Sequence, residues 1–212
     1  NGNVTYGEVQ SLHGHDAFLI EFQQLERLLD GVFKKDATKK GLKILKFGGK
    51  SLQNGDGLKR VLQIITDKYN KGERLGVVLS ARAKATDTLE SLLERASKGE
   101  VDDEVLAGFE AYQKSTSTAV DFSKELKYLS KRLHGVSLLG DYSLKTKDEV
   151  LSIGELISCK LVVSLLQEAG TPAVLIDTRE LLKTDNGFGN ARINEAVSKE
   201  NVLTKFASLD ID

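Results

Sequence analysis

The stretch Lys43-Ile44-Leu45-Lys46-Phe47-Gly48-Gly49-Lys50-Ser51 is the most informative part of the chain. A short apolar run that ends in two glycines predicts a buried strand entering a tight turn. Glycine lets backbone N–H groups approach a ligand, because no Cβ stands in the way. Successive N–H groups in such a turn bind anions, a helix starting just after it adds its positive end, and Lys46 and Lys50 bring further positive charge. The stretch therefore predicts a phosphate-binding turn.

Two kinds of nucleotide-binding protein end a strand in a similar way. A Walker A loop needs a glycine five positions before its Gly-Lys-Ser, and that position is Ile44 here, so the match fails. The other candidate is the amino-acid kinase superfamily. The run Lys46-Phe47-Gly48-Gly49-x-Ser51 resembles the opening motif of aspartokinases, which usually reads Lys-Phe-Gly-Gly-Thr-Ser. Lys50 stands where that family usually has threonine.

Composition limits the class of protein. The chain has 212 residues, of which 40% are hydrophobic and 29% charged, as in an ordinary globular protein of one domain, or one domain plus an appendage. Its net charge of −1 gives no general attraction to nucleic acid or to a membrane. A single cysteine, Cys159, excludes an internal disulfide framework and fits a reducing compartment. No signal peptide or membrane-length apolar run is visible, so we expect a cytoplasmic protein.

Residues 1–33 follow a different pattern from the rest. They predict a strand at 4–9, a polar loop that contains His15, and an amphipathic helix over 17–29. Strand, histidine loop and final helix is how α/β-hydrolases end. The run Gly14-His15-Asp16-Ala17-Phe18-Leu19 resembles the C-terminal histidine motif of homoserine O-acetyltransferases. The resemblance implies that His15 is a former member of an acetyltransferase triad; the alternative is a loop histidine without a task.

Residues 34–41 are charged and small without an apolar period, which predicts a linker rather than a nucleic-acid-binding tail.

From residue 42 the pattern becomes α/β. A helix is predicted over 56–70, closed by Gly72, and a buried strand over 75–81. Such a strand–helix–strand unit predicts a parallel crossover with ligands at the carboxyl ends of the strands. This places Gly48, Gly49 and Ser80 along one rim.

A second motif follows the second strand. Val77-Val78-Leu79-Ser80-Ala81, with Lys84-Ala85-Thr86-Asp87 after it, resembles the second aspartokinase signature. The resemblance implies that Ser80 and Thr86 line the substrate pocket, with Thr86 touching aspartate. Thr86 as the N-cap of the next helix is the structural alternative, and both can hold together. Arg82 receives no role.

The third motif is Ser152-Ile153-Gly154-Glu155, ahead of an apolar helix over 156–166. In aspartokinases Ser-x-Gly-Glu places a glutamate that holds the α-ammonium of aspartate, which implies this role for Glu155. The alternative is a glutamate that complements the dipole at a helix N-terminus. Three signatures in order and at family spacing favour the first interpretation.

The rest of the chain carries weaker signals. Residues 88–133 predict helices, and His134 is expected at a helix end within a run, 134–140, that resembles aspartokinases joined to homoserine dehydrogenase. A further strand is predicted over 173–177, with Asp177 at the ligand rim. The glycine-rich turn at 185–191 resembles a family loop that closes over substrate.

The resemblance implies a three-layer αβα fold with a mostly parallel central sheet, incomplete here, behind a short α/β-hydrolase-like tail. Residues 42–212 would be the N-terminal part of an aspartokinase catalytic domain. The chain has no methionine, so we expect a piece of a longer polypeptide, fused to homoserine dehydrogenase and acetyltransferase activities and inactive alone.

The implied reaction is transfer of the γ-phosphoryl group of ATP to the β-carboxylate of L-aspartate, with Mg²⁺ accompanying the nucleotide and no metal held by the protein. Lys46, Gly48 and Gly49 would act on the phosphates, and the substrate-binding residues would be Ser51, Ser80, Thr86 and Glu155. A homo-oligomer is expected, without a nucleic-acid or membrane partner. Two alternatives stay open: another amino-acid kinase, or a non-catalytic lobe for assembly or sensing, which Lys50 favours.

Overall fold

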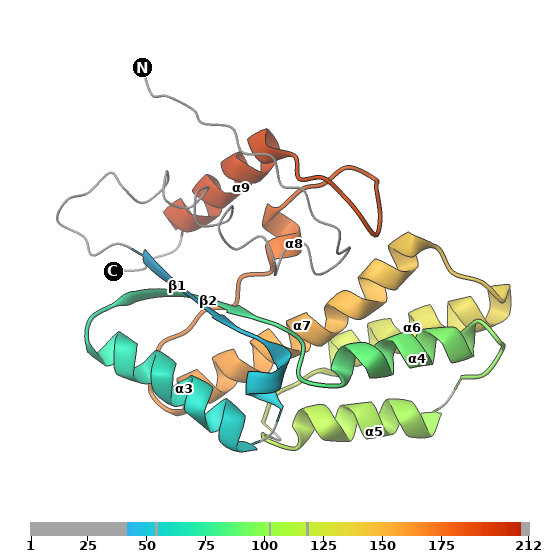
Figure 1. Cartoon of the computed structure of the whole chain (residues 1–212), viewed down its shortest axis with the longest axis horizontal. Coiled ribbons are helices and arrows are strands. Elements are labelled where there is room, and N and C mark those ends of the chain that lie inside the picture. Colours follow the sequence, from blue (N-terminus) through green and yellow to red (C-terminus); the bar gives the residue numbers. More distant parts are fainter. Residues whose placement is uncertain (1–41, 54, 102, 118, 209–212) are drawn as a thin grey trace. The chain divides into compact units, whose positions relative to one another are not determined.

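The computed structural model describes residues 42–53, 55–101, 103–117 and 119–208, which form a mixed α/β fold with a small parallel sheet (Figure 1). The predicted acetyltransferase-like tail, His15 and the linker lie outside the described residues. The elements in chain order are β1 (Leu42–Phe47), the 3-10 helix η1 (Gly49–Leu52), α3 (Gly55–Asn70), β2 (Arg74–Leu79), α4 (Ala85–Ala96), α5 (Asp103–Lys114), α6 (Ser123–Leu139), α7 (Leu144–Glu168), α8 (Thr178–Leu181) and α9 (Glu195–Ser208).

The chain divides into two compact units. Residues 42–175 form the larger one, which holds the sheet and helices α3 to α7. Residues from Ile176 onward, with α8 and α9, belong to the other. No helix in the described part of the chain is long and apolar enough to cross a membrane.

Strands β1 and β2 and the helix α3 between them follow from the apolar pattern. Strands β1 and β2 pair in parallel, with Lys46 opposite Val78 and Phe47 opposite Leu79. Helix α3 connects them and buries an apolar stripe consisting of Leu58, Val61 and Ile65. Gly72, with a φ of +70°, lets the chain leave the helix in a left-handed conformation that disfavours other residues. The predicted crossover is therefore confirmed.

Helices α4 to α7 pack against one another and provide most of the core (Figure 1). Apolar residues recur at helical spacing on each of them, which is what buries one stripe per helix. Helix α7 is central, since it packs against α3, α4, α6 and β2. The largest fully buried side chains of this core include Leu52, Leu89, Leu93, Phe122, Leu129, Leu133, Leu151, Ile157 and Leu161.

Three sequence expectations about elements are wrong. The predicted strand over 173–177 is an extended segment that is not paired with β1 or β2; the carbonyl of Ala173 accepts a hydrogen bond from the Gln167 side chain instead. Helix α7 begins at Leu144, well before the expected 156, because the hydroxyl of Ser143 caps the backbone N–H of Thr146. His134 is an exposed residue inside α6, which continues to Leu139.

The second unit contains a short capped helix and a tight loop. Asp177, expected at a strand end, is the N-cap of α8 and accepts a hydrogen bond from the backbone N–H of Arg179. The glycine-rich turn is closed by an antiparallel bridge between Thr184 and Ile193. Ser198 of α9 accepts from the backbone N–H of Lys183, which ties that helix to the loop.

Candidate functional site

The carboxyl ends of β1 and β2 are joined by backbone hydrogen bonds. The N–H of Ser80 donates to the carbonyl of Phe47 at 3.1 Å, and the N–H of Ala83 donates to the carbonyl of Gly49 at 3.2 Å. The turn after β1 and the loop after β2 therefore lie side by side. The structure brings together Gly48, Gly49 and Ser80, as the crossover geometry predicts.

The two glycines of the turn have different surroundings. A Cβ on Gly49 would stand 2.5 Å from the carbonyl oxygen of Ala81, so glycine is required there for the two loops to approach each other. A Cβ on Gly48 would meet nothing within 4 Å, and Gly48 has an extended backbone. The open space that a ligand needs is thus beside Gly48. At Gly49, glycine is needed because the loop after β2 packs against it, and not to let a ligand approach.

The polar groups of the turn are accessible. Lys46 on β1, Lys50 and Ser51 are all exposed. The N–H of Ser51 donates to the carbonyl of Gly48 at 2.9 Å, which closes the turn. Because Gly49 and Lys50 open the 3-10 helix η1, their N–H groups have no acceptor within it. Exposed ammonium groups beside such N–H groups can hold a phosphate.

Thr86 lies in the first turn of α4 and is half-buried. The N-cap of α4 is Lys84, so the alternative interpretation of Thr86 as the cap is wrong. Lys84 has a φ of +67° and is the one non-glycine residue with a left-handed backbone in the described part of the chain. A lysine in this conformation is strained and marks the loop between Ser80 and Thr86 as tightly constrained.

Glu155 lies in the middle of α7, because that helix begins at Leu144. The helix-dipole interpretation of Glu155 is therefore wrong, since the field of a helix end acts within its first turn. The neighbouring Gly154 packs against the loop after β2: a Cβ on Gly154 would stand 2.9 Å from the Cβ of Ala81. This close contact holds the Glu155 segment against the loop that leads to Thr86.

Arg82 is a residue that the sequence interpretation missed. It is only 2% exposed. Its backbone N–H donates to the Ser158 hydroxyl at 3.0 Å, and its Nε donates to the carbonyl of Leu52 at 3.2 Å. Its Nη1 donates to the carbonyls of Tyr112 and Gln113, and its Nη2 to the Thr116 hydroxyl.

Burial lowers the pKa of the Arg82 guanidinium, while the nearby Tyr112 raises it. An arginine between two alanines directly after a buried strand was the available sequence signal. It could not reveal the partners, which come from distant parts of the chain.

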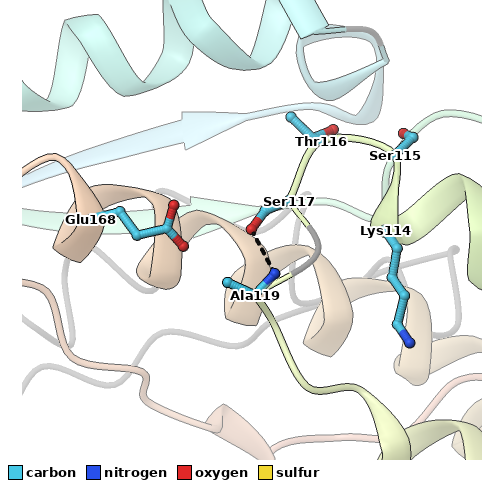
Figure 2. Close-up of a pocket in the computed structure, with 6 residues that line it drawn as sticks. All are labelled: Lys114, Ser115, Thr116, Ser117, Ala119 and Glu168. Atoms are coloured by element: carbon cyan, nitrogen blue, oxygen red, sulfur yellow. Dashed lines mark hydrogen bonds between the residues drawn. The ribbon is translucent and has the colours of Figure 1, made fainter.

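Two pockets lie in the larger unit, and neither is lined by a predicted site residue. The first, of about 390 Å³, lies over the connection between α5 and α6 and is lined by Lys114, Ser115, Thr116, Ser117, Ala119 and Glu168. Figure 2 shows these side chains, with the N–H of Ala119 donating to the Ser117 hydroxyl at 3.2 Å. The second, of about 290 Å³ and mostly apolar, lies between the start of α4 and α5 and is lined by Lys84, Thr88, Val105, Gly108, Phe109 and Tyr112.

The donors at the turn suit phosphates rather than a metal ion. N–H groups and ammonium groups bind anions, whereas Mg²⁺ prefers carboxylate oxygens. Among the described residues no group of three or more His, Cys, Asp or Glu side chains could hold a metal ion. The residues present thus fit the phosphates of a nucleotide, with any cation bound through those phosphates.

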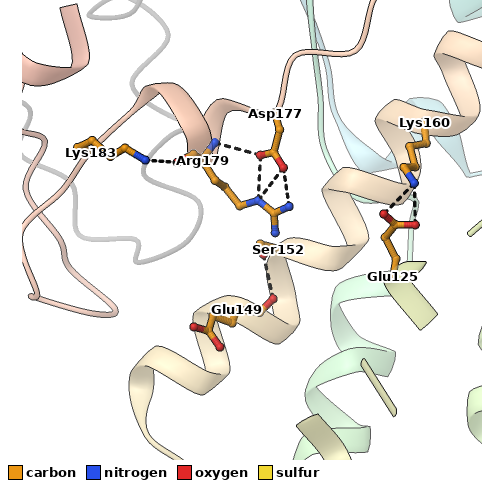
Figure 3. Close-up of polar contacts among 7 residues, drawn as sticks. All are labelled: Glu125, Glu149, Ser152, Lys160, Asp177, Arg179 and Lys183. Carbon is orange, nitrogen blue, oxygen red and sulfur yellow. Dashed lines mark hydrogen bonds and ion pairs between the residues drawn. The ribbon is translucent and has the colours of Figure 1, made fainter. Parts of the chain in front are cut away.

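Two further polar pairs have structural roles (Figure 3). Glu125 of α6, 6% exposed, binds the Lys160 ammonium of α7 through both carboxylate oxygens at 2.7 and 2.8 Å. In the second unit, the carboxylate of Asp177 binds the Arg179 guanidinium, with the shortest distance 2.6 Å. Neither pair involves a predicted site residue.

The carboxylate of Asp185 holds the glycine-rich turn. Its Oδ1 accepts from the backbone N–H groups of Gly187 at 2.9 Å and Arg192 at 3.1 Å. These two hydrogen bonds lower the pKa of Asp185 below its ordinary value of 3.8.

Comparisons with known proteins agree with this geometry. Residues 41–209 match the model of the amino acid kinase family. The chain is 32% identical over 203 residues to aspartokinase 3, chloroplastic, of Arabidopsis thaliana, covering 84% of this chain and 36% of that protein. It is 27% identical over 177 residues to the chloroplastic bifunctional aspartokinase/homoserine dehydrogenase 1 of Zea mays, covering 77% of this chain and 19% of that protein.

A solved structure shows the same fold. Escherichia coli aspartokinase III, in complex with aspartate and ADP in its R-state, superposes with a TM-score of 0.65 at 26% identity. The match covers 78% of this chain and 37% of that chain. The present chain thus spans about a third of the length of aspartokinase 3 and of this structure.

Proposed function

Because the chain belongs to the amino acid kinase family, we propose that it forms the aspartate-binding part of an aspartokinase. The proposed reaction transfers the γ-phosphoryl group of ATP to the β-carboxylate of L-aspartate and yields 4-phospho-L-aspartate, the first step toward lysine, threonine and methionine. The observation that carries the proposal is the hydrogen-bonded junction of the Gly48–Gly49 turn with the Ser80–Ala83 loop. The Gly154–Glu155 segment packs against that same loop.

Phosphoryl transfer depends chiefly on positioning and on stabilising negative charge. In the proposed site, Lys46 acts as a point charge on the phosphates, and the N–H groups at Gly48 and Gly49 bind the oxygens of the transferred group. Ser51 adds a hydroxyl at the end of the same turn. Mg²⁺, brought with ATP, would share the charge between the β- and γ-phosphate oxygens.

The aspartate side of the proposed site is built from two helices. Glu155 of α7 accepts hydrogen bonds from the α-ammonium group, because a compact cation binds best to a charged acceptor. Thr86 of α4 and Ser80 offer hydroxyls to the carboxylates. The contact between Gly154 and Ala81 sets the distance between the Glu155 segment of α7 and the loop that carries Ser80 and leads to Thr86.

We propose further that the chain is part of a larger enzyme. The relatives are about three times longer than the matched region, so other segments are proposed to complete the nucleotide pocket and the three-layer αβα sheet. A homo-oligomer fused to homoserine dehydrogenase, with residues 1–33 as an acetyltransferase-like end and 34–41 as a linker, remains our proposal for the assembly.

The test is aspartate-dependent acyl phosphate formation, trapped with hydroxylamine, in the full natural polypeptide. We expect Lys46→Ala and Glu155→Ala to lower kcat/KM about a hundredfold or more, as the loss of a charged group at a reacting centre does. Matched controls are Lys43→Ala, an exposed lysine on the same strand that pairs with Glu73, and Glu149→Ala on the same helix, which pairs with Arg132. Both controls should keep wild-type activity.

Different results would separate the alternatives. Turnover of another acid but not aspartate, in a substrate panel, would make the protein a different amino-acid kinase. No turnover by the intact protein would favour a non-catalytic lobe, which the exposed Lys50 in place of threonine supports. In that case Lys50→Thr should restore turnover if the lobe has only lately lost activity.

A further inference from the structure

Arg82 joins several segments around the proposed site through hydrogen bonds. It lies in the loop after β2, its side chain reaches the carbonyl of Leu52 directly after the phosphate turn, and its backbone N–H reaches Ser158 of α7. The other donors of the guanidinium bind residues 112–116, at the end of α5 and just beyond it. Three other parts of the chain thus meet at this buried residue: Leu52 and residues 112–116 at its side chain, and Ser158 at its backbone N–H.

The positive charge of Arg82 is stabilised by the dipoles of backbone carbonyls and a hydroxyl group. No described carboxylate lies within ion-pair distance of its guanidinium; its acceptors are the carbonyls of Leu52, Tyr112 and Gln113 and one hydroxyl. Tyr112 and Gln113 lie in the last turn of α5, where the carbonyls lack partners within the helix and carry partial negative charge. The guanidinium also lies 4.5 Å from the centre of the Tyr112 ring.

The need to fill space in the core does not explain why an arginine occupies position 82. An apolar side chain could fill the same volume without the cost of burying a charge. A guanidinium differs from it, and from lysine, by offering several N–H donors in a rigid plane, which can hold several segments in one arrangement. The tyrosine adds to this, because its hydroxyl donates to the carbonyl of Gln53 at 2.9 Å, next to the carbonyl that Arg82 binds.

From these contacts we propose that Arg82 is a positioning residue for phosphoryl transfer: it holds the Gly48–Ser51 turn in place against the loop after β2. This inference rests on the proposed function. Arg82 itself touches neither substrate. Its side chain fixes the phosphate side, while Thr86 and Glu155 are held by their own helices. The backbone N–H that binds Ser158 is present whatever the side chain.

The test compares Arg82→Lys and Arg82→Met with wild type in the full natural polypeptide, measuring kcat and both KM values. We expect KM for ATP to rise or kcat to fall about tenfold in both variants, because a misplaced phosphate turn misaligns the reacting groups. KM for aspartate should stay within about twofold of wild type. Lysine should fail to rescue, since its single ammonium lacks the rigid fork of donors that binds Leu52 and residues 112–116 at once.

Arg132→Lys is the matched control. Arg132 also lies over a tyrosine ring, 4.9 Å from the centre of Tyr128, and donates to its hydroxyl at 2.9 Å, but it is on α6 and partly exposed. Its substitution should leave all kinetic constants at wild-type values. If Arg82→Lys does not fold, Tyr112→Phe decides, because it removes only the hydrogen bond to Gln53 and should raise KM for ATP about threefold.

The outcomes can be told apart. Wild-type kinetic constants in a folded Arg82→Lys protein of lower thermal stability would overturn the inference and leave the proposed function standing. An equal rise of both KM values would also overturn it, because it would show a general loosening. Absence of turnover in the wild-type protein would overturn the proposed function itself, and the inference with it.

Discussion

Neighbouring glycines with unlike surroundings give a direct test at the scale of single residues. We expect Gly49→Ala to destabilise the protein by about 2 kcal/mol, because its Cβ would overlap a backbone carbonyl that cannot move freely. Gly48→Ala should change the free energy of unfolding by less than about 0.5 kcal/mol, since its Cβ would enter open space. Urea denaturation followed by circular dichroism measures both.

Gly48→Ala also tests the phosphate turn. A methyl group in the space proposed for the phosphates should raise KM for ATP although the fold is intact. If instead the two substitutions destabilise the protein equally, the contact between Gly49 and Ala81 does not have the role that we assign to it.

The strained lysine gives a second residue-scale prediction. Lys84→Gly should raise the free energy of unfolding by about 0.5–1 kcal/mol, because glycine adopts a φ of +67° without steric cost. Lys98→Gly is the control: it is an exposed turn lysine without a positive φ, so glycine there should destabilise by increasing the entropy of the unfolded chain. If Lys84→Gly and Lys98→Gly have equal effects on thermal unfolding, the backbone of Lys84 is not strained as we infer.

At the scale of elements, the ion pair between α6 and α7 joins two helices of the core. We expect Glu125→Ala to cost about 2 kcal/mol, because it leaves the Lys160 ammonium partly buried without its carboxylate. Glu110→Ala breaks a more exposed pair with Lys114 at the same distance, 2.7 Å, and should cost about 0.5 kcal/mol or less. Similar losses in a chemical denaturation series would show that burial does not matter at Glu125.

The glycine-rich turn should depend on pH. The pKa of Asp185 is lowered in the folded protein, so its charged form stabilises the turn above the ordinary value of 3.8 and this contribution is lost as the pH falls through the lower folded value. In an NMR titration from about pH 5 to about pH 2 the amide of Gly187 should shift with a midpoint below 3.8. Asp185→Asn should abolish that shift; a midpoint above the ordinary value would contradict the hydrogen-bond assignment.

Elements were predictable where their apolar period was complete, as in β1, α3 and β2. The start of α7 was missed because its first two turns, with Lys145, Lys147, Asp148 and Glu149, show little apolar period. The run at 173–177 has a strand-like composition, yet strand formation also requires a neighbour to pair with, which composition does not reveal.

The site was predictable only in part, for a related reason. The turn at Gly48–Gly49 and the loop at Ser80 lie at strand ends, and parallel topology alone brings them together. The burial of Arg82 depends on carbonyls at the ends of other elements, and the φ of Lys84 depends on how its loop is closed. Neither the burial of Arg82 nor the φ of Lys84 can be predicted from the residues next to it in the sequence.

At the scale of the whole molecule, the apolar cluster lies entirely within residues 42–175. We therefore expect a fragment of residues 42–175 to fold alone, with helical circular dichroism and one cooperative thermal transition. A matched fragment that ends within α7, at residue 155, should not, because it loses Ile157, Leu161 and Leu166 from the core. A non-cooperative transition in the longer fragment would show that it needs the second unit.

Arg82 has a consequence for the order of folding. Its side-chain partners are 30 to 34 positions away in the chain, and Ser158 is 76 positions away. Contacts between such distant positions form after local ones, because each must first close a long loop. Pulsed hydrogen exchange during refolding should therefore protect the amides of η1 after those of α3. A chain still emerging from the ribosome would carry both strands and yet lack a finished phosphate turn until the end of α5 had been made.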